Sequence, residues 1–463
     1  MPGRKLWGAA ALFAVLSPYI RAQTATDMAA LKGLAPVTVL SNSAAGQAAL
    51  GANYVVTGGI QIGAIAQPTL LPFSEQQQQA LRDVFITGGN VAQLADGLGT
   101  TLGAAYLARA HYIDRQNFTS LSETVANVLA YANATSRGNS NSAKFFFANA
   151  TTDGTHPVSA EASAILKNNG GSTDPFGRAY GRPAGTAGAD KYGDSRPFQT
   201  EPSLTRIIGP DYFNSPADNY VYNRGPMMDL TNSPSYPSGH TTYGYTGALV
   251  LAILVPERYA QMITRGAEYG NDRIIVGAHY AMDVLGGRTL ALYDVAHLLA
   301  NDPAYVGRSL IGAQVIKNFR EAVKTARAEM TQVLQAACGD SVKVCAHQDT
   351  GRFSDSAADE AFYASTQTYN LPVVYPKNAG VLEDVGKLAP EAGYLLTSAF
   401  PSLTLDQANQ ILTDTEGPGG GFLDDGSPFG IYSRLNLCAA FSRAQQQAGG
   451  QVRASLAAHT HPR

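Results

Sequence analysis

His279 stands four residues before Asp283 and six residues after Arg273. Residues four apart lie on the same face of a helix, so a helix here would bring the imidazole and the carboxylate together. A carboxylate that keeps one ring nitrogen protonated leaves the other nitrogen available as a nucleophile or a base. Histidine–aspartate pairs are also common on helix surfaces, so this pair alone does not separate a catalytic role from a structural one.

A second histidine ends the segment Pro237-Ser238-Gly239-His240. The stretch that follows, Thr241 to Val255, is apolar with few breakers and predicts a helix. Ser238 and Gly239 would then lie at the helix N-terminus, where backbone N–H groups and the helix dipole favour an anion. Because glycine has no Cβ, an anion can approach the backbone closely there. His240 would lie at the rim of this site as a proton donor; the alternative is an ordinary helix cap with an exposed histidine.

Two cations, Lys191 and Arg196, precede these segments in a glycine-rich stretch. An arginine guanidinium binds two oxygens of one tetrahedral anion at once, and a lysine adds a point charge. Either residue alone is more often simply solvated. Together, the three clusters contain the groups that attack on a phosphate monoester requires, namely cations for the equatorial oxygens, a nucleophile and an acid.

These residues resemble the type 2 phosphatidic acid phosphatase superfamily, which includes bacterial class A non-specific acid phosphatases and vanadium-dependent haloperoxidases. The pattern of that family is Lys-x6-Arg-Pro, then Pro-Ser-Gly-His, then Ser-Arg-x5-His-x3-Asp. Here Arg196-Pro197 matches the end of the first part, and residues 237–240 match the second in full. Arg273, His279 and Asp283 match the third at the family spacing. The resemblance implies a helical bundle of the acid phosphatase and vanadium haloperoxidase type.

The resemblance also implies a role for each of these residues. His279 would be the nucleophile that forms a phosphohistidine, Asp283 would orient it, and His240 would be the general acid. The phosphoryl oxygens would be bound by Lys191, Arg196, Ser238, Gly239 and Arg273. No metal or other cofactor is implied for this reaction.

Two positions depart from the family pattern. Ala189 stands where the ungapped pattern has lysine, and Lys191 follows two residues later. A shift of two residues in a loop would let Lys191 reach the same oxygen. Asp272 replaces the serine of the third part, which predicts different hydrogen bonding around Arg273 and an added negative charge nearby.

Three functions are compatible with these motifs. The first is an acid phosphatase-like phosphoric monoester hydrolase that is independent of metal. The second is a vanadium-dependent haloperoxidase, in which the pocket holds vanadate and His279 coordinates it. The third is a non-catalytic exported protein that captures phosphate. The presence of His240, His279 and Asp283 argues against the third function, since capture needs only the cations.

The N-terminus indicates export. Arg4 and Lys5 precede an apolar run from Leu6 to Leu16, and Ala22 offers a small residue for cleavage. This pattern predicts a signal peptide over residues 1–22 and a periplasmic or secreted protein. Beyond it, no apolar stretch reaches the ~18 residues that a membrane-spanning helix needs.

Composition and cysteine spacing agree with an exported globular protein. The chain has 463 residues, 45% of them hydrophobic, and a net charge of -3 without a long basic run, which argues against a nucleic-acid partner. The expected partners are small phosphorylated substrates, lipid phosphates among them. Cys338 and Cys345 are close enough to form a disulfide, and Cys438 is left over.

Hydrophobic patterning divides the mature chain into three parts. Residues 23–73, rich in Ala, Gly, Thr and Pro, predict an irregular N-terminal arm. Helical periodicity through residues 74–300 predicts an all-α phosphatase core, interrupted by Gly/Asn/Ser-rich loops at 136–142 and 168–190. Residues 301–463 predict a C-terminal extension of helices and loops.

Overall fold

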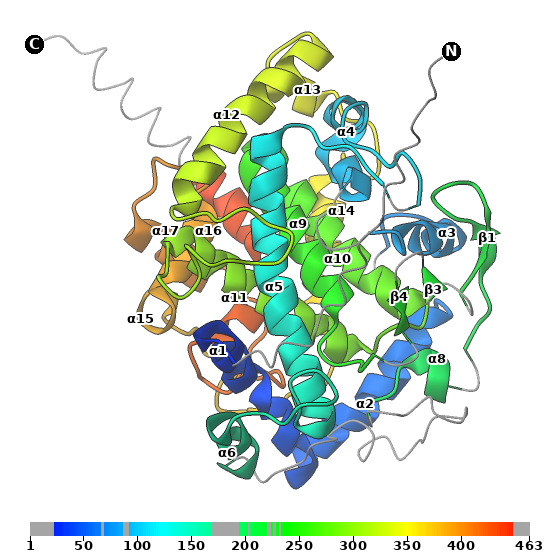
Figure 1. Cartoon of the computed structure of the whole chain (residues 1–463), viewed down its shortest axis with the longest axis vertical. Coiled ribbons are helices and arrows are strands. Elements are labelled where there is room, and N and C mark those ends of the chain that lie inside the picture. Colours follow the sequence, from blue (N-terminus) through cyan, green and yellow to red (C-terminus); the bar gives the residue numbers. More distant parts are fainter. Residues whose placement is uncertain are drawn as a thin grey trace, which may run out of the picture.

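The chain is built almost entirely of helices, and the prediction of an all-α fold is confirmed. Figure 1 shows long helices packed around a buried centre, with shorter helices and loops on the outside. This computed structural model describes residues 23–65, 69–86, 92–115, 117–168, 194–201, 204–219, 224–225, 228–230 and 233–447. The signal peptide expected over 1–22 and most of the loop expected over 168–190 lie outside the described residues.

Four helices form the centre of the molecule: α5 (Glu123–Asn149), α9 (Gly239–Leu254), α10 (Tyr259–Ile275) and α11 (Ala281–Ala300). α9 packs against each of the other three, and every one of its residues is buried. A helix that is apolar on all sides is expected in such a position. A short 3-10 helix, η4 (Pro256–Arg258), separates α9 from α10.

The turn between α10 and α11 folds the chain back toward the start of α9. Gly277 adopts a φ of +76°, in the left-handed region that favours glycine. The N–H of His279 then donates to the carbonyl of Arg273 at 3.2 Å. The N–H of Ser238, beside the start of α9, donates to the carbonyl of Asp283 at 3.0 Å. The end of α10 and the beginnings of α9 and α11 therefore lie together.

The N-terminal segment is helical, so the prediction of an irregular arm over 23–73 was wrong. It forms α1 (Ala25–Leu34), the 3-10 helix η1 (Ala35–Asn42) and α2 (Ala44–Gln61). Their small residues weaken the hydrophobic periodicity but allow close packing. A Cβ at Gly33, for example, would lie 2.1 Å from the ring of Phe429.

The arm also supports the turn that leads into α11. On α2, the side chains of Asn53 and Thr57 accept hydrogen bonds from the N–H groups of Met282 (3.0 Å) and Ala281 (3.1 Å). The first N–H groups of a helix have no acceptor within the helix, so these two side chains supply the missing hydrogen-bond acceptors. The N-terminal arm thereby helps to position Asp283, one residue further on.

The loop expected over 136–142 is instead the middle of α5, because its small polar residues have partners inside the bundle. The Asn139 amide donates to the Asp294 carboxylate of α11 at 2.8 Å. The Thr246 hydroxyl of α9 donates to Ser136 at 3.0 Å. Burial together with these hydrogen bonds between helices outweighs the local preference of such residues for turns.

Shorter elements complete the core region. The helices are α3 (Phe73–Asp83), η2 (Ala92–Leu98), α4 (Gly99–Leu107), α6 (Ala160–Asn168) and α8 (Pro197–Thr200). The strands are β1 (Ile208–Pro210), antiparallel to β2 (Pro216–Asp218), and β3 (Arg224–Gly225), antiparallel to β4 (Met228–Asp229).

The C-terminal part is helical and loop-rich and packs on the centre. Its elements are α12 (Phe319–Cys338), α13 (Val342–His347), α14 (Ser356–Thr366), α15 (Val385–Leu388), η5 (Pro390–Gly393), α16 (Tyr394–Thr397), α17 (Leu405–Asp414) and η6 (Gly430–Ser433). α14 packs on α10, and η5, α16 and η6 pack on α11. The expected disulfide between Cys338 and Cys345 is present, and Cys438 is buried with a free thiol.

None of the described helices combines the length and the apolar character that crossing a membrane requires.

Replacing Asn53 with alanine should lower the free energy of unfolding by about 1–2 kcal/mol, because the buried N–H of Met282 loses its acceptor. Urea unfolding of the purified variant would measure this loss. The matched control is Gln47→Ala, which removes an exposed hydrogen bond on the same helix. Equal unfolding free energies for the two variants would contradict the supporting role of α2.

Candidate active site

One carboxylate both caps α11 and contacts the imidazole of His279. Because the helix begins at Ala281, His279 lies in the preceding turn and not on the helix face that the spacing predicted. The contact forms nevertheless, with Nδ1 of His279 lying 3.3 Å from Oδ2 of Asp283. The same oxygen accepts hydrogen bonds from the N–H of Tyr280 at 2.9 Å and from the hydroxyl of Ser235. Burial raises the pKa of Asp283 to about 6, and these two hydrogen bonds act in the opposite direction.

Arg196 determines which nitrogen of His279 carries the proton. Its guanidinium nitrogen NH1 lies 2.9 Å from Nε2 of His279. A guanidinium can only donate, so Nε2 must accept with its lone pair and the ring proton lies on Nδ1, toward Asp283. Burial, followed by the charges of Arg196 and Lys144, holds the pKa of His279 well below its usual value. The imidazole is therefore neutral with its lone pair on Nε2, which is the nucleophilic form.

Arg196 itself is fully buried, immediately before α8. It donates to the carbonyls of Ser233 (2.8 Å), Pro234 (2.9 Å) and Ala278 (3.1 Å). The guanidinium thus joins the loop before α9 to the turn before α11. These bonds fix the orientation of the planar group before any anion arrives.

Ser238 and Gly239 form the N-terminus of α9, as predicted. The Ser238 hydroxyl accepts from the N–H of Thr241 at 3.0 Å, and because it is an acceptor in that bond it keeps its own proton for another partner. The Ser238 N–H is already used by the carbonyl of Asp283. The backbone groups that remain in the first turn for an anion are the N–H groups of Gly239 and His240.

The imidazole of His240 lies close to that of His279, with 6.0 Å between the ring centroids. Only 3% of the residue is exposed, so it is enclosed and does not lie at an open rim. Burial, then the charges of Arg273, Lys144 and Arg196, hold its pKa well below the usual value. A bound anion would offset these cations and favour protonation of His240.

Arg273 and Asp272, adjacent on α10, belong to different environments. Arg273 is 1% exposed and its charge acts on both histidines. Asp272 instead accepts a hydrogen bond from the Gln76 amide at 2.8 Å. Burial, then the nearby carboxylates of Asp83 and Glu268, raise its pKa well above the usual value. The Asp272 side chain is therefore directed to this buried network. The extra negative charge expected beside Arg273 stays a prediction.

The cation predicted at Lys191 lies outside the described residues. A different lysine, Lys144 of α5, reaches the site and was not identified from the sequence. Only 5% of it is exposed, and a Cβ added to Gly239 would lie 3.0 Å from its Nζ. The sequence offered one signal for it, since Lys144 stands between the apolar residues Ala143 and Phe146.

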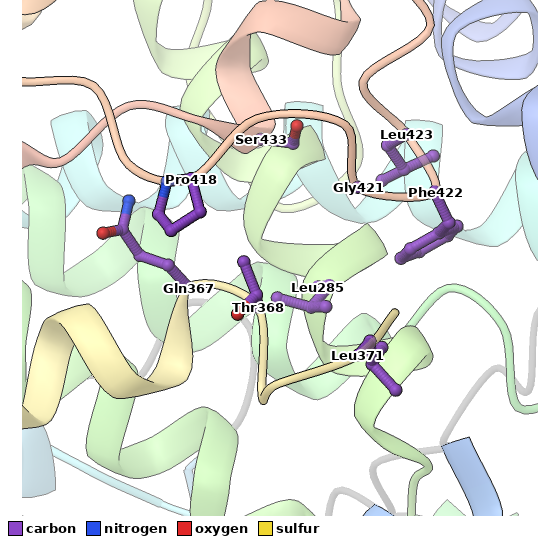
Figure 2. A pocket seen from close by; sticks show the side chains of 9 residues that line it. All are labelled: Leu285, Gln367, Thr368, Leu371, Pro418, Gly421, Phe422, Leu423 and Ser433. Carbon is purple, nitrogen blue, oxygen red and sulfur yellow. The ribbon is translucent and has the colours of Figure 1, made fainter. Parts of the chain in front are cut away.

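A small apolar pocket lies beside the start of α11, between Leu285 and loops of the C-terminal part. Figure 2 shows Leu285 on one side, Leu371 below it, and Pro418 and Phe422 across the opening. The ring of Phe422 also packs edge-on against Tyr236, with 6.4 Å between the centroids. The C-terminal part thus contacts the segment that carries Ser235 and Ser238.

No three His, Cys, Asp or Glu side chains converge on a possible metal position in the part of the chain that the structure describes. The polar groups of the site, two histidines and several cations, are instead suited to an oxyanion.

The site residues from Arg196 onward lie in a region that is similar to known proteins. A family model described as the PAP2 superfamily matches residues 180–301. Over 69 residues, the chain is 45% identical to an acid phosphatase of Zymomonas mobilis and 46% identical to a non-specific acid phosphatase of Salmonella typhimurium. It is also 33% identical over 87 residues to a lipid A 1-phosphatase of Rhizobium johnstonii.

These similarities are local. The two acid phosphatase matches cover 15% of this chain and 26% and 28% of the relatives. The lipid A phosphatase match covers 18% of the chain and 34% of the relative.

In the ligand-free protein, His279 should be neutral at neutral pH with its proton on Nδ1. Nitrogen-15 NMR of histidine-labelled protein distinguishes the two ring nitrogens, and a pH titration should place its midpoint well below the usual value of ~6.5. The exposed His347 provides a reference signal in the same spectra. A proton on Nε2, or a midpoint near that of a free imidazole, would contradict the tautomer that Arg196 imposes.

Proposed function

Because this chain belongs to the PAP2 superfamily and is related to the bacterial non-specific acid phosphatases, we propose that it hydrolyses phosphoric monoesters through a phosphohistidine at His279. The observation that carries the proposal is the state of His279. Its Nδ1 contacts the Asp283 carboxylate while its Nε2 presents a lone pair toward the cation of Arg196. A phosphoryl group that replaced this contact would meet a nucleophile and a counter-charge together.

In the first step, the phosphoryl oxygens are bound by Arg196, Arg273, the Ser238 hydroxyl and the N–H groups of Gly239 and His240. Nε2 of His279 attacks phosphorus and forms a P–N bond as the P–O bond to the leaving group breaks. His240 donates a proton to the leaving oxygen. The Asp283 carboxylate stabilises the positive charge that develops on His279.

In the second step, water attacks the phosphohistidine. The now neutral His240 accepts a proton from the water as the new P–O bond forms and the P–N bond breaks. Inorganic phosphate leaves, and the lone pair returns to Nε2 of His279. The same two histidines thus complete the cycle, and no step uses a metal. The predicted role of Lys191 in binding an oxygen stays a prediction.

The substrates that we propose are small phosphorylated molecules and lipid phosphates. Family membership and the similarity to a lipid A 1-phosphatase support the second class. We also propose an exported location, on the basis of the N-terminal pattern alone.

Replacing His279 with alanine should lower kcat on an aryl phosphate by about 10⁴-fold or more, because the nucleophile is lost. The assay would run from about pH 4 to 8 with a chelator present, since the optimum follows the acid and base groups. His347→Ala, at an exposed histidine, is the control and should keep full activity.

Three outcomes are informative. Undiminished turnover in the His279 variant would refute the phosphohistidine. Phosphate binding without turnover in the wild type would favour the capture protein. Halide oxidation in the presence of peroxide and vanadate would favour the haloperoxidase.

Replacing Ser235 with alanine should shift the acid side of the pH profile of kcat/KM to higher pH. The Ser235 hydroxyl lowers the pKa of Asp283, which is about 6, so its removal raises that pKa. Asp283 must be ionised to orient His279, and activity is therefore lost as pH falls through this pKa. The exposed Ser120→Ala is the control. An unchanged acid side in Ser235→Ala would show that Asp283 does not govern it.

A further inference from the structure

We infer that the ammonium group of Lys144, contributed by α5, is a phosphate-binding cation of this pocket. The inference rests on the proposed function, because it assigns a ligand contact within the same site. The family motif has its lysine seven residues before the arginine, and Ala189 stands at that position here. Lys144 lies 52 residues before Arg196 in the chain and on a different element, so the motif does not include it.

The position of Lys144 is determined by the inner face of α5. Its neighbours Ala143, Phe146 and Phe147 are all fully buried, so the aliphatic stem enters the core with them. The stem ends over the first residue of α9. A Cβ at Gly239 would lie 3.0 Å from Nζ and 3.4 Å from Cε of Lys144. The amine is therefore at the helix N-terminus where the backbone N–H groups favour an anion.

The charges around Lys144 favour a dianion in the pocket. Asp194 and Asp283 attract the ammonium, whereas Arg196 and Arg273 repel it. Among the described residues, none of the ion pairs within 4.0 Å includes Lys144. Asp194 accepts from the N–H of Tyr236 at 2.9 Å, and Asp283 is occupied by the groups that orient His279. A buried ammonium without a close counter-ion is unfavourable, and a phosphoryl group would supply one.

Burial, then the charge of Arg196, lowers the pKa of Lys144 to about 7. The groups that face its amine are Asp194 and Arg196 before α8, His240 on α9, Arg273 at the end of α10, and His279 and Asp283 before and on α11. An anion that binds beside the amine favours its charged form. Above neutral pH, binding must therefore take up a proton.

Sulfate binding measured by calorimetry tests the inference, because the charge of sulfate is constant through the neutral range. Lys144→Met keeps the apolar stem and removes the charge. At about pH 6.5 it should weaken sulfate binding by about 10- to 100-fold, the usual range for a charge-assisted hydrogen bond. The control Lys324→Met removes an exposed lysine of α12 and should bind sulfate as the wild type does. Unchanged binding in a folded Lys144→Met would overturn the inference.

A second measurement does not depend on Lys144→Met. Calorimetry near pH 8 in buffers of different ionisation enthalpy should report proton uptake on sulfate binding, because the anion favours the charged form of the Lys144 amine. A bound anion also favours protonation of His240, so the measurement uses His240→Asn, in which that imidazole is absent. Uptake in that variant supports the inference. If Lys144→Met fails to fold, Lys144→Gln takes its place, and unchanged sulfate binding in that variant would overturn the inference.

The two proposals fail in different ways. If sulfate binding depends on Lys144 but the protein has no phosphatase activity, the binding cation stands and the enzyme proposal falls. If turnover requires His279 but sulfate binding is indifferent to Lys144, the enzyme proposal stands and the cation is refuted.

Discussion

The Asp283 carboxylate joins three segments of the chain at the site. Its Oδ2 accepts from the Tyr280 N–H, from the Ser235 hydroxyl and from Nδ1 of His279. The backbone carbonyl of the same residue, Asp283, accepts from the Ser238 N–H beside α9. A buried carboxylate with a raised pKa is unfavourable in isolation, and these donors are what make an ionised Asp283 possible. One residue, Asp283, therefore fixes the start of α11, the loop before α9 and the orientation of the nucleophile.

Arg196 complements Asp283 from the opposite side of His279. Its contacts to backbone carbonyls fix the loop and the turn, and its contact to Nε2 of His279 keeps the lone pair of the imidazole on that nitrogen. The Asp283 carboxylate and the Arg196 guanidinium together determine the tautomer of the His279 imidazole. An active site that is preorganised in this way does not need to rearrange when charge develops during the reaction.

The buried charged residues on α10 have two different sets of neighbours. On one side, Arg273 faces the histidines. On the other, Asp272 lies in a network in which Arg265 pairs with Asp83 at 2.7 Å and the Gln76 amide reaches both Glu268 and Asp272. The aspartate that replaces the family serine is accommodated by this network through its hydrogen bond with Gln76. On the other side, the pocket receives the amine of Lys144 from α5.

The sequence by itself revealed the likeness to the PAP2 superfamily, predicted the all-α class and singled out His240, His279, Asp283, Arg196 and Arg273, because short motifs require specific residue types at specific spacings. Local pattern also predicted the helices between 238 and 300, where apolar periodicity is strong. It failed for the arm over 23–73 and for residues 136–142, since small and polar residues there are buried only through partners far away in the chain. Tertiary structure alone decided the positions of Lys144, Asp194 and Ser235 around the site. It also decided that Asp272 points away from the site. Such contacts join separate helices and loops, and no local spacing encodes which side chains will meet in a packed interior.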